Sequence, residues 1–288
     1  MGMLFNSYIF LLFFFVVYAL YLASHKSLSK QNLLLLTASY VFYGTWDWRF
    51  LFLIILSTLV DYVIGLKLHQ TPTDTTPSKR RRKQLVIISV IVNLGILGFF
   101  KYFNFFADNL EQVLLAFGLN PDPITLNIIL PVGISFYTFQ TMSYTLDIYR
   151  GTLKPTKNLL NFALFVAFFP QLVAGPIERA SHLLPQMERK RSLSPKMINT
   201  AIFLILWGYV KKVVIADHAS IIADQIFNNY QSYGGLDILI AVLAFSVQIY
   251  CDFSAYSDIA RGISRLMGFE LMVNFRLPYF ANSPSDFW

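Results

Sequence analysis

The stretch Leu4–Leu22, LFNSYIFLLFFFVVYALYL, indicates the fold class. It contains no charged side chain, and its length is close to the about 20 residues that a helix needs to cross the hydrocarbon core of a bilayer. No Lys or Arg precedes Lys26, so the basic segment that opens a cleaved signal peptide is missing. We therefore predict that Leu4–Leu22 is a retained transmembrane helix.

The composition extends this prediction to the whole chain. Hydrophobic residues make up 56% of the 288 residues and charged residues 14%, whereas soluble domains have about 45–50% and about 25%. The later apolar runs are Leu33–Thr45, Phe50–Leu66, Leu85–Phe106, Ile128–Leu146, Leu159–Ile177, Met197–Val210 and Ile238–Cys251. The sequence predicts an all-α polytopic membrane protein with about eight or more tilted transmembrane helices, forming one membrane-embedded domain over residues 1–288.

The net charge of +7 indicates membrane topology rather than nucleic-acid binding, because Lys and Arg lie between the apolar runs. Two loops, at about residues 67–84 and 178–196, are strongly basic and are predicted to face the cytoplasm. Three crossings counted back from the first loop place the N-terminus outside.

Three apolar runs lie between the two basic loops, although only an even number of crossings lets both loops face the cytoplasm. The run Leu159–Ile177 is the best candidate for a segment that does not cross, because Pro170, Gly175 and Pro176 interrupt its second half. Broken backbone at membrane depth is tolerated only where protein or a water-filled cavity covers it. We predict a re-entrant element near residues 159–177.

Two apolar segments each carry a polar helix face. The first face has polar residues at offsets of three, four and three from Tyr137 to Asp147, and the second has one every four residues from Gln248 to Tyr256. Polar groups left without partners in hydrocarbon cost several kcal/mol each, so such faces contact protein or water. Either they line a functional cavity or they join helices by hydrogen bonds. The candidate lining residues are Tyr137, Gln140, Tyr144, Asp147, Gln171, Gln248, Asp252 and Tyr256.

Other ionisable residues suggest structural roles. Asp258 and Arg261 are spaced for an ion pair on one helix. Asp61 and Asp252 have no cation at helical spacing, and Asp252 therefore needs a cation from elsewhere, or water. Lys211–Lys212 is expected to mark the end of a span, with both side chains reaching the interface.

Neither a catalytic base nor a metal site follows from these residues alone. The four histidines lie in polar loops or at the end of an apolar run, not within a polar face: His25, His69, His182 and His218. Cys251 is the single cysteine, which excludes an intrachain disulfide and a cysteine-based metal cluster.

Four motifs in order, spread along the chain, resemble those of the bacterial membrane-bound O-acyltransferases, in particular the members that serve alginate O-acetylation. They are LPVGISFYTFQ at 130–140, DIYRG at 147–151, FPQLVAGPI at 169–177 and QIYCDFSAYSD at 248–258. The resemblance implies a ring of tilted helices around a thinned centre, with a tunnel joining the two sides of a bacterial cytoplasmic (inner) membrane.

The resemblance also implies a reaction. Such proteins pass an acyl group from a cytoplasmic donor, acetyl-CoA for the alginate type, to an exported polysaccharide or to a partner acetyltransferase outside; no bound cofactor is expected. The family's catalytic histidine follows a motif that ends here at Ser285–Trp288, and none of the four histidines matches it. We therefore expect these residues to be the N-terminal part of an acyltransferase, with little activity alone.

Two other interpretations stay open. A transporter or flippase for a small anion or a lipid-linked sugar would use the polar faces as a permeation path, although such folds usually carry two related halves and no repeat is apparent here. The second interpretation is an inactive fragment that only occupies the membrane or binds a partner.

Overall fold

The computed structural model describes residues 3–72, 75–118, 128–173 and 175–287. Within these ranges the chain is helical and contains no strand, which confirms the predicted all-α class. The helices are α1 Tyr8–Ala23, α2 Leu28–Asp47, η1 Trp48–Phe50, α3 Leu51–Gln70, α4 Thr76–Ala116, α5 Ile134–Arg150, α6 Leu159–Ala167, α7 Phe169–Leu172, α8 Ala180–Met187, α9 Pro195–Tyr209, η2 Val210–Ala216, α10 Asp217–Asn228, η3 Tyr230–Ser232, α11 Gly235–Leu266, η4 Pro278–Phe280 and α12 Pro284–Phe287.

The described part of the chain contains four helical stretches that are long and apolar enough to cross a membrane: Leu28–Gln70, Thr76–Ala116, Pro195–Asn228 and Gly235–Leu266. Helix α1 and the segment Leu159–Leu172 are shorter apolar helices. These findings fit the predicted polytopic membrane protein. The number of crossings and their direction stay predictions.

Helix α1 begins later than the first apolar run. The hydroxyl of Ser7 accepts a hydrogen bond from the Phe10 amide at 3.2 Å and caps the helix, so Leu4 to Asn6 lie outside it. Its 16 residues extend about 24 Å at 1.5 Å per residue, less than the about 30 Å of a bilayer core. The prediction of a helix from Leu4 was therefore wrong at its start.

The chain forms two compact units. Unit 1 comprises residues 1–3, 27–173 and 179–188, with helices α2 to α8. Unit 2 comprises residues 4–26, 174–178 and 189–288, with α1 and the helices from α9 onward. The single membrane domain stays a prediction.

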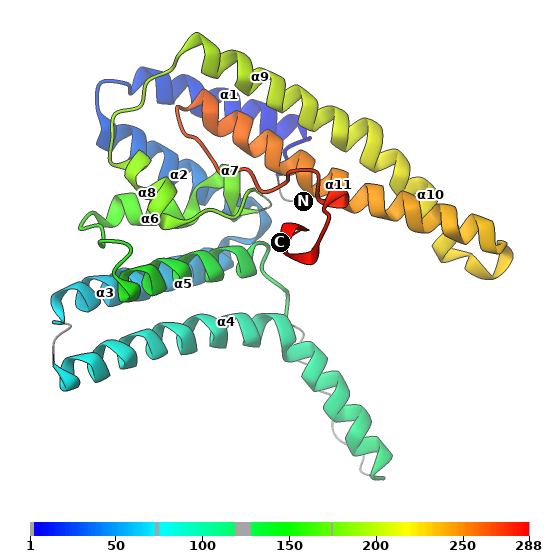
Figure 1. Ribbon diagram of the computed structural model, residues 1–288, viewed down its shortest axis with the longest axis horizontal. Coiled ribbons are helices and arrows are strands. Elements are labelled where there is room, and N and C mark those ends of the chain that lie inside the picture. Colours follow the sequence, from blue (N-terminus) through cyan, green and yellow to red (C-terminus); the bar gives the residue numbers. More distant parts are fainter. Residues whose placement is uncertain (1–2, 73–74, 119–127, 174, 288) are drawn as a thin grey trace. The chain divides into compact units, whose positions relative to one another are not determined.

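In unit 1, helices α3, α4 and α5 pack side by side (Figure 1). A glycine allows α3 and α5 to approach: a Cβ atom on Gly65 would lie 2.9 Å from a ring carbon of Tyr144. Gly133, just before α5, has φ +73°, and a Cβ there would lie 2.6 Å from the carbonyl oxygen of Leu172. Because this conformation and this contact both exclude a side chain, Gly133 brings the start of α5 against α7.

The segment predicted to be re-entrant is not one spanning helix. Helix α6 has nine residues and α7 has four, with a break at Phe168, and the side chains around the break are fully buried. The Phe169 amide, freed by the break, donates to the hydroxyl of Ser39 at 3.0 Å. Protein therefore covers the broken backbone, which is a condition for such a break within the hydrocarbon core of a bilayer. The side from which the segment enters a membrane stays a prediction.

The basic run Lys79–Lys83, predicted to lie in a loop, instead occupies the first turns of α4. Arg82 is buried and donates to the carbonyl oxygens of Leu68 and, at 2.9 Å, Tyr149. These carbonyls belong to the last turns of α3 and α5, where helix carbonyls lack intrahelical partners and favour a cation. The prediction of a loop was wrong for this run, because the Thr75 side chain caps α4 and the helix begins at Thr76.

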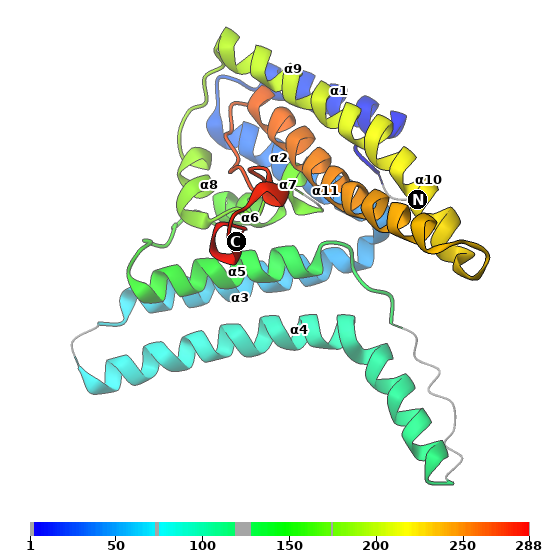
Figure 2. The ribbon, with the colours of Figure 1, turned by 45° about the vertical axis from the view of Figure 1, so that its right-hand side comes forward.

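In unit 2, α9, η2 and α10 form one continuous helical stretch beside α11 (Figure 2). The crossing of α9 and α11 depends on two glycines. A Cβ on Gly208 would lie 2.9 Å from the carbonyl oxygen of Ala255, and one on Gly262 would lie 2.7 Å from that of Ala201. Each glycine therefore admits the backbone of the other helix, as small residues do in membrane helix pairs.

Candidate functional site

The polar face of α5 is buried in unit 1. The rings of Tyr137 and Tyr144 are fully buried, and Tyr144 packs on Phe162 of α6 with ring centroids 4.4 Å apart. Asp147 lies half-buried near the C-terminal end of α5. In this structure these residues contact protein, which is the pattern expected of helix-to-helix packing.

Two predicted residues meet at the break between α6 and α7. The side-chain amides of Gln140 and Gln171 both donate to the carbonyl oxygen of Phe165, at 2.7 and 2.8 Å. This carbonyl lies in the last turn of α6, where no further turn supplies an N–H. The two glutamines therefore hold the broken segment against α5, and the sequence prediction that grouped them is consistent with this contact.

Asp61 of α3 is the centre of a second polar cluster in unit 1. It is fully buried and accepts hydrogen bonds from the hydroxyl of Ser89, from the Asn93 amide at 2.7 Å and from the Thr145 hydroxyl at 2.9 Å. The sequence left its partners unknown. A usable signal existed, because Ser89 and Asn93 are four residues apart in an apolar run and thus share a face.

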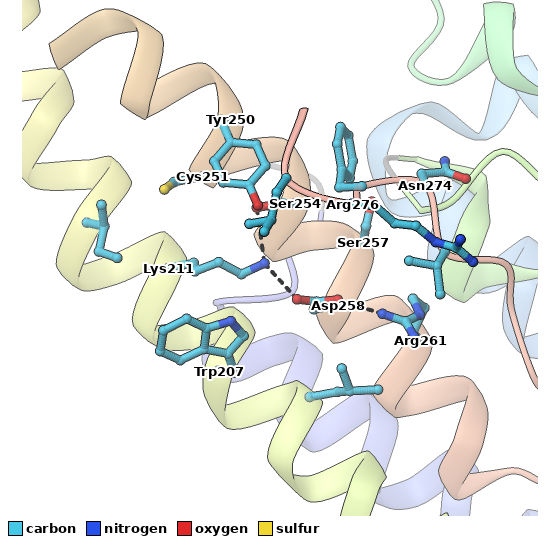
Figure 3. A pocket seen from close by; sticks show the side chains of 15 residues that line it. Trp207, Lys211, Tyr250, Cys251, Ser254, Ser257, Asp258, Arg261, Asn274 and Arg276 are labelled. Atoms are coloured by element: carbon cyan, nitrogen blue, oxygen red, sulfur yellow. Dashed lines mark hydrogen bonds and ion pairs between the residues drawn. The ribbon is translucent and has the colours of Figure 1, made fainter. Parts of the chain in front are cut away.

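Unit 2 carries a charged cluster between η2 and α11 (Figure 3). The ammonium of Lys211 lies 2.6 Å from Asp258 and donates to Ser254 at 3.0 Å. Arg261 contacts the other oxygen of Asp258 at 2.9 Å, which confirms the predicted local ion pair. Lys211 is buried, with 7% of its side chain exposed. The prediction that its side chain reaches the interface was wrong, because Lys211 turns into the protein and pairs with Asp258; the end of the span stays a prediction.

Lys212, next to this cluster, supplies the cation for Asp252 of α11. Lys212 contacts Asp252 at 2.6 Å and Asp217 at 2.9 Å, and its ammonium lies 5.8 Å from the ring centroid of Tyr256. Asp252 thus obtains its cation from another helix, as predicted. The structure groups Asp252 and Tyr256 around Lys212, whereas Gln248 lies half-buried one turn earlier and its side-chain oxygen has no partner among the described residues.

Lys211 and Lys212 both reach α11 because η2 is a π-helical segment. A π-helix has hydrogen bonds from residue i to i+5 and occurs mostly as short bulges, frequently at functional sites. The wider turn reduces the angle between consecutive side chains. Two adjacent lysines therefore form ion pairs with acids that lie six positions apart on one neighbouring helix.

A cavity of about 450 Å³ opens beside this cluster. Its polar wall includes Lys211, Ser257, Asp258 and Arg261, and the segment 273–277 closes another side (Figure 3). The volume falls within the range of about 300–1,000 Å³ of small-molecule sites.

The histidines lie elsewhere. All four are exposed, and the Nδ1 atom of His218 lies 3.2 Å from the carbonyl oxygen of Val213 in its own helix. In the described ranges no group of three or more His, Cys, Asp or Glu side chains is arranged to hold a metal ion. The geometry therefore does not assign a general base to any of these histidines.

Comparisons with known proteins show which enzymes this chain resembles. No family model matches the chain. A protein of Pseudomonas aeruginosa described as a "probable alginate O-acetylase" is 42% identical over 287 residues, which cover 99% of this chain and 54% of that protein. A peptidoglycan O-acetyltransferase of Helicobacter pylori is 34% identical, over 99% of this chain and 58% of that protein. Over nearly its whole length the chain is therefore similar to named O-acetyltransferases, in agreement with the resemblance to the membrane-bound O-acyltransferases.

A third relative is more distant. A teichoic acid D-alanyltransferase of Bacillus subtilis is 25% identical over 173 residues, which cover 56% of this chain and 42% of that protein. The chain spans about half the length of the O-acetyltransferases that it matches. Its similarity to these enzymes and its all-helical architecture agree with the resemblance stated from the motifs.

Proposed function

We propose that this acyltransferase takes part in moving an acetyl group from acetyl-CoA in the cytoplasm to an exported polysaccharide, such as alginate or a peptidoglycan glycan. The observation that carries the proposal is identity of 34–42% over 99% of the chain with proteins named as O-acetylating enzymes of alginate and peptidoglycan. Acetyl transfer to a carbohydrate hydroxyl is the chemistry that these names share.

The same proposal includes a location and partners. The chain would lie in a bacterial cytoplasmic membrane with its N-terminus outside, which the positions of the two basic segments support. The acceptor outside would be the polysaccharide itself or a partner acetyltransferase that modifies it. Membrane lipid would cover the many exposed apolar side chains of the long helices.

Within this proposal the polar faces line the acyl path. In unit 1 the lining residues of α5 share that helix with Thr145, a donor to the buried Asp61, and in unit 2 Asp252 of α11 accepts a hydrogen bond from Lys212. Since no histidine here matches the family's catalytic position, we propose that the part of the relatives outside the match supplies the general base. Removal of such a base costs about 10² to 10⁴ in rate.

The transporter interpretation is not favoured, because the named relatives are transferases. Polar faces that pack on protein need no moving permeation path, and a fixed acyl path places no requirement on two alternating halves.

O-acetylation in cells tests the function. Cells that lack their own enzyme would receive either residues 1–288 or these residues joined to the part of the Pseudomonas relative outside the match. We expect acetyl ester on the exported polysaccharide from the joined protein, at least about 10²-fold above residues 1–288 alone. Absence of ester from both, with both proteins present in the membrane, would reject the proposal.

Accessibility to a thiol reagent tests the lining residues. After Cys251→Ser, single cysteines would replace the half-buried Gln140 and Asp147 in turn, with Phe139→Cys as the matched control on the outer face of α5, where 56% of the phenylalanine is exposed. We expect a small charged thiol reagent to label the lining positions and not the lipid-facing control. Labelling restricted to position 139 would contradict a water-filled path along α5.

A further inference from the structure

One end of unit 1 carries a dense group of exposed positive charges. Helix α3 ends, α4 begins and α5 ends at this side of the unit (Figures 1 and 2). The guanidinium of Arg82 ties the three together, because it donates to the carbonyl oxygens of Leu68 and Tyr149. The loop after α5 joins them where the Tyr62 hydroxyl donates to the Lys157 carbonyl at 2.7 Å. The exposed cations of these segments form the basic surface: Lys67, Lys79, Arg80, Arg81, Lys83, Arg150, Lys154 and Lys157.

The cations of the basic surface have no charge partner within the part of the chain that the structure describes. None of them forms an ion pair there. The first turn of α4 contains no acid, and Glu188, which lies close to the loop after α5, accepts a hydrogen bond from the Thr156 hydroxyl at 2.7 Å. Cations in the first turns of a helix also oppose its dipole. Lys79 to Lys83 therefore do not stabilise their own helix through charge, and the exposed ones are accessible to an anion from outside the chain.

The basic surface lies where the apolar helix segments end. Lys67 directly follows the apolar run Phe50–Leu66, and Lys83 lies two residues before the run Leu85–Phe106. Arg150 follows the end of the run Ile128–Leu146 by about one helical turn. Phospholipid headgroups begin where the hydrocarbon core ends. Cations at these positions are therefore level with lipid phosphates, and their long stems can follow the apolar surface to reach them.

The opposite ends of the same helices lack this excess of positive charge. Asp47 and Arg49, just before α3, pair with each other at 2.6 Å. The second half of α4 carries Lys101 together with Asp108 and Glu111. The unpaired positive charge of these helices is therefore concentrated at one end, which in a bilayer corresponds to one leaflet.

We propose that the basic surface binds the headgroups of anionic phospholipids and enriches these lipids around unit 1. Their phosphates lie at the depth of Lys67, Lys83 and Arg150, and they carry the net negative charge that zwitterionic lipids lack. Clusters of about four to eight Lys and Arg directly beside a membrane span bind anionic lipid in this way. Arginine and lysine both form strong charge-assisted hydrogen bonds to phosphate oxygens. This inference concerns the lipid around the protein and does not depend on the acetyl transfer proposed above.

Fluorescence quenching beside the basic surface tests the proposal. After Cys251→Ser, the variant Gln84→Cys would carry a bimane fluorophore. Gln84 is exposed and follows Arg80 and Arg81 by four and three residues, so it lies on their face of α4. The full 288-residue chain would be placed in phosphatidylcholine nanodiscs that contain a small, equal amount of either spin-labelled phosphatidylglycerol or spin-labelled phosphatidylcholine. The difference in quenching reports the local enrichment of the anionic lipid.

We expect phosphatidylglycerol to be enriched about fivefold or more at position 84, because each Lys or Arg near a membrane surface adds attraction of about that size. At Phe106→Cys, where 66% of the phenylalanine at the far end of the same apolar run is exposed, the enrichment should stay within about twofold of none, since the basic surface is more than a Debye length away. Raising the salt concentration from about 0.1 M to about 1 M should remove most of the enrichment at position 84, because the Debye length falls from about 10 Å to about 3 Å.

Two lysines of α4 form a matched pair of variants. Lys83 and Lys101 are both exposed and form no ion pair among the described residues, and Lys101 lies about 27 Å further along the helix. Lys83→Gln should lower the enrichment at position 84 by about two- to fivefold. Addition of Arg80→Gln and Arg81→Gln should make the two lipids quench almost alike. Lys101→Gln should leave the enrichment within about 1.5-fold of the parent.

Either of two results would overturn the proposal. Equal quenching by the two lipids at position 84 of the parent protein would show that the basic surface does not select anionic lipid, and would leave its charges to a soluble polyanion. Equal effects of Lys83→Gln and Lys101→Gln would assign the enrichment to the net charge of the chain. The salt series uses the parent charges throughout, so its result does not depend on the folding of any charge variant.

Discussion

Replacement of Gly262 by valine is expected to lower the free energy of unfolding of unit 2 by about 3 kcal/mol or more. A Cβ atom at this position would lie 2.6 Å from a side-chain carbon of Ile205 and 2.7 Å from the backbone oxygen of Ala201. Ile205 has freedom to rotate, but the backbone of α9 does not. The two helices would separate and lose the packing that positions Lys211 beside Asp258.

The measurement is unfolding in mixed detergent micelles, followed by far-ultraviolet circular dichroism. Gly98→Val is the matched control, because Gly98 also lies within a helix but a Cβ there meets nothing within 4 Å. The control should change the unfolding free energy by less than about 1 kcal/mol. Equal effects at the two glycines would mean that the α9–α11 crossing does not require a residue without a side chain.

Asp61→Ala is expected to destabilise unit 1 by about 3 kcal/mol or more. The change removes the acceptor shared by three buried donors, the hydroxyls of Ser89 and Thr145 and the amide of Asn93. Water has little access to them, because Asp61 is fully buried. Asp61→Asn should cost about half as much, since one side-chain oxygen stays available as an acceptor.

The same unfolding measurement applies, with Asp108→Ala as control. Asp108 is exposed on α4, and surface substitutions usually change stability by less than about 0.5 kcal/mol. If Asp61→Ala proved as mild as Asp108→Ala, the network would not contribute to the packing of α3 against α4 and α5. An Asp61→Asn protein less stable than Asp61→Ala would contradict the shared-acceptor account.

The helical membrane class could be predicted from the apolar runs, but the helix ends could not. The uncharged run Ile128–Leu146 gives a helix only from Ile134, because Gly133 has a positive φ. The run Leu85–Phe106 lies inside the much longer α4, whose start is set by the Thr75 cap. Helix ends depend on caps and polar turns outside the runs, so the length of an apolar run is a poor guide to the length of its helix.

Site contacts within one helix could be predicted from the sequence, whereas contacts between different helices could not. The spacing of Asp258 and Arg261 correctly indicated their ion pair, because both lie on α11. The pairing of Lys211 with the same acid depends on the π-helical turn and on the glycine crossing, and neither has a clear signal in one sequence. Tertiary packing therefore formed the cavity that the motifs alone did not indicate.

Transfer of labelled acetyl in sealed membrane vesicles tests the central claim most directly. Vesicles containing residues 1–288 joined to the remaining part of the Pseudomonas relative would receive radiolabelled acetyl-CoA on the cytoplasmic face, with acceptor polysaccharide, and any partner acetyltransferase it needs, on the opposite face. The account predicts label in ester linkage on the polysaccharide, and none when the labelled donor is supplied only on the acceptor's side. Transfer from that side alone, or no transfer from either side, would contradict an acyl path across the membrane.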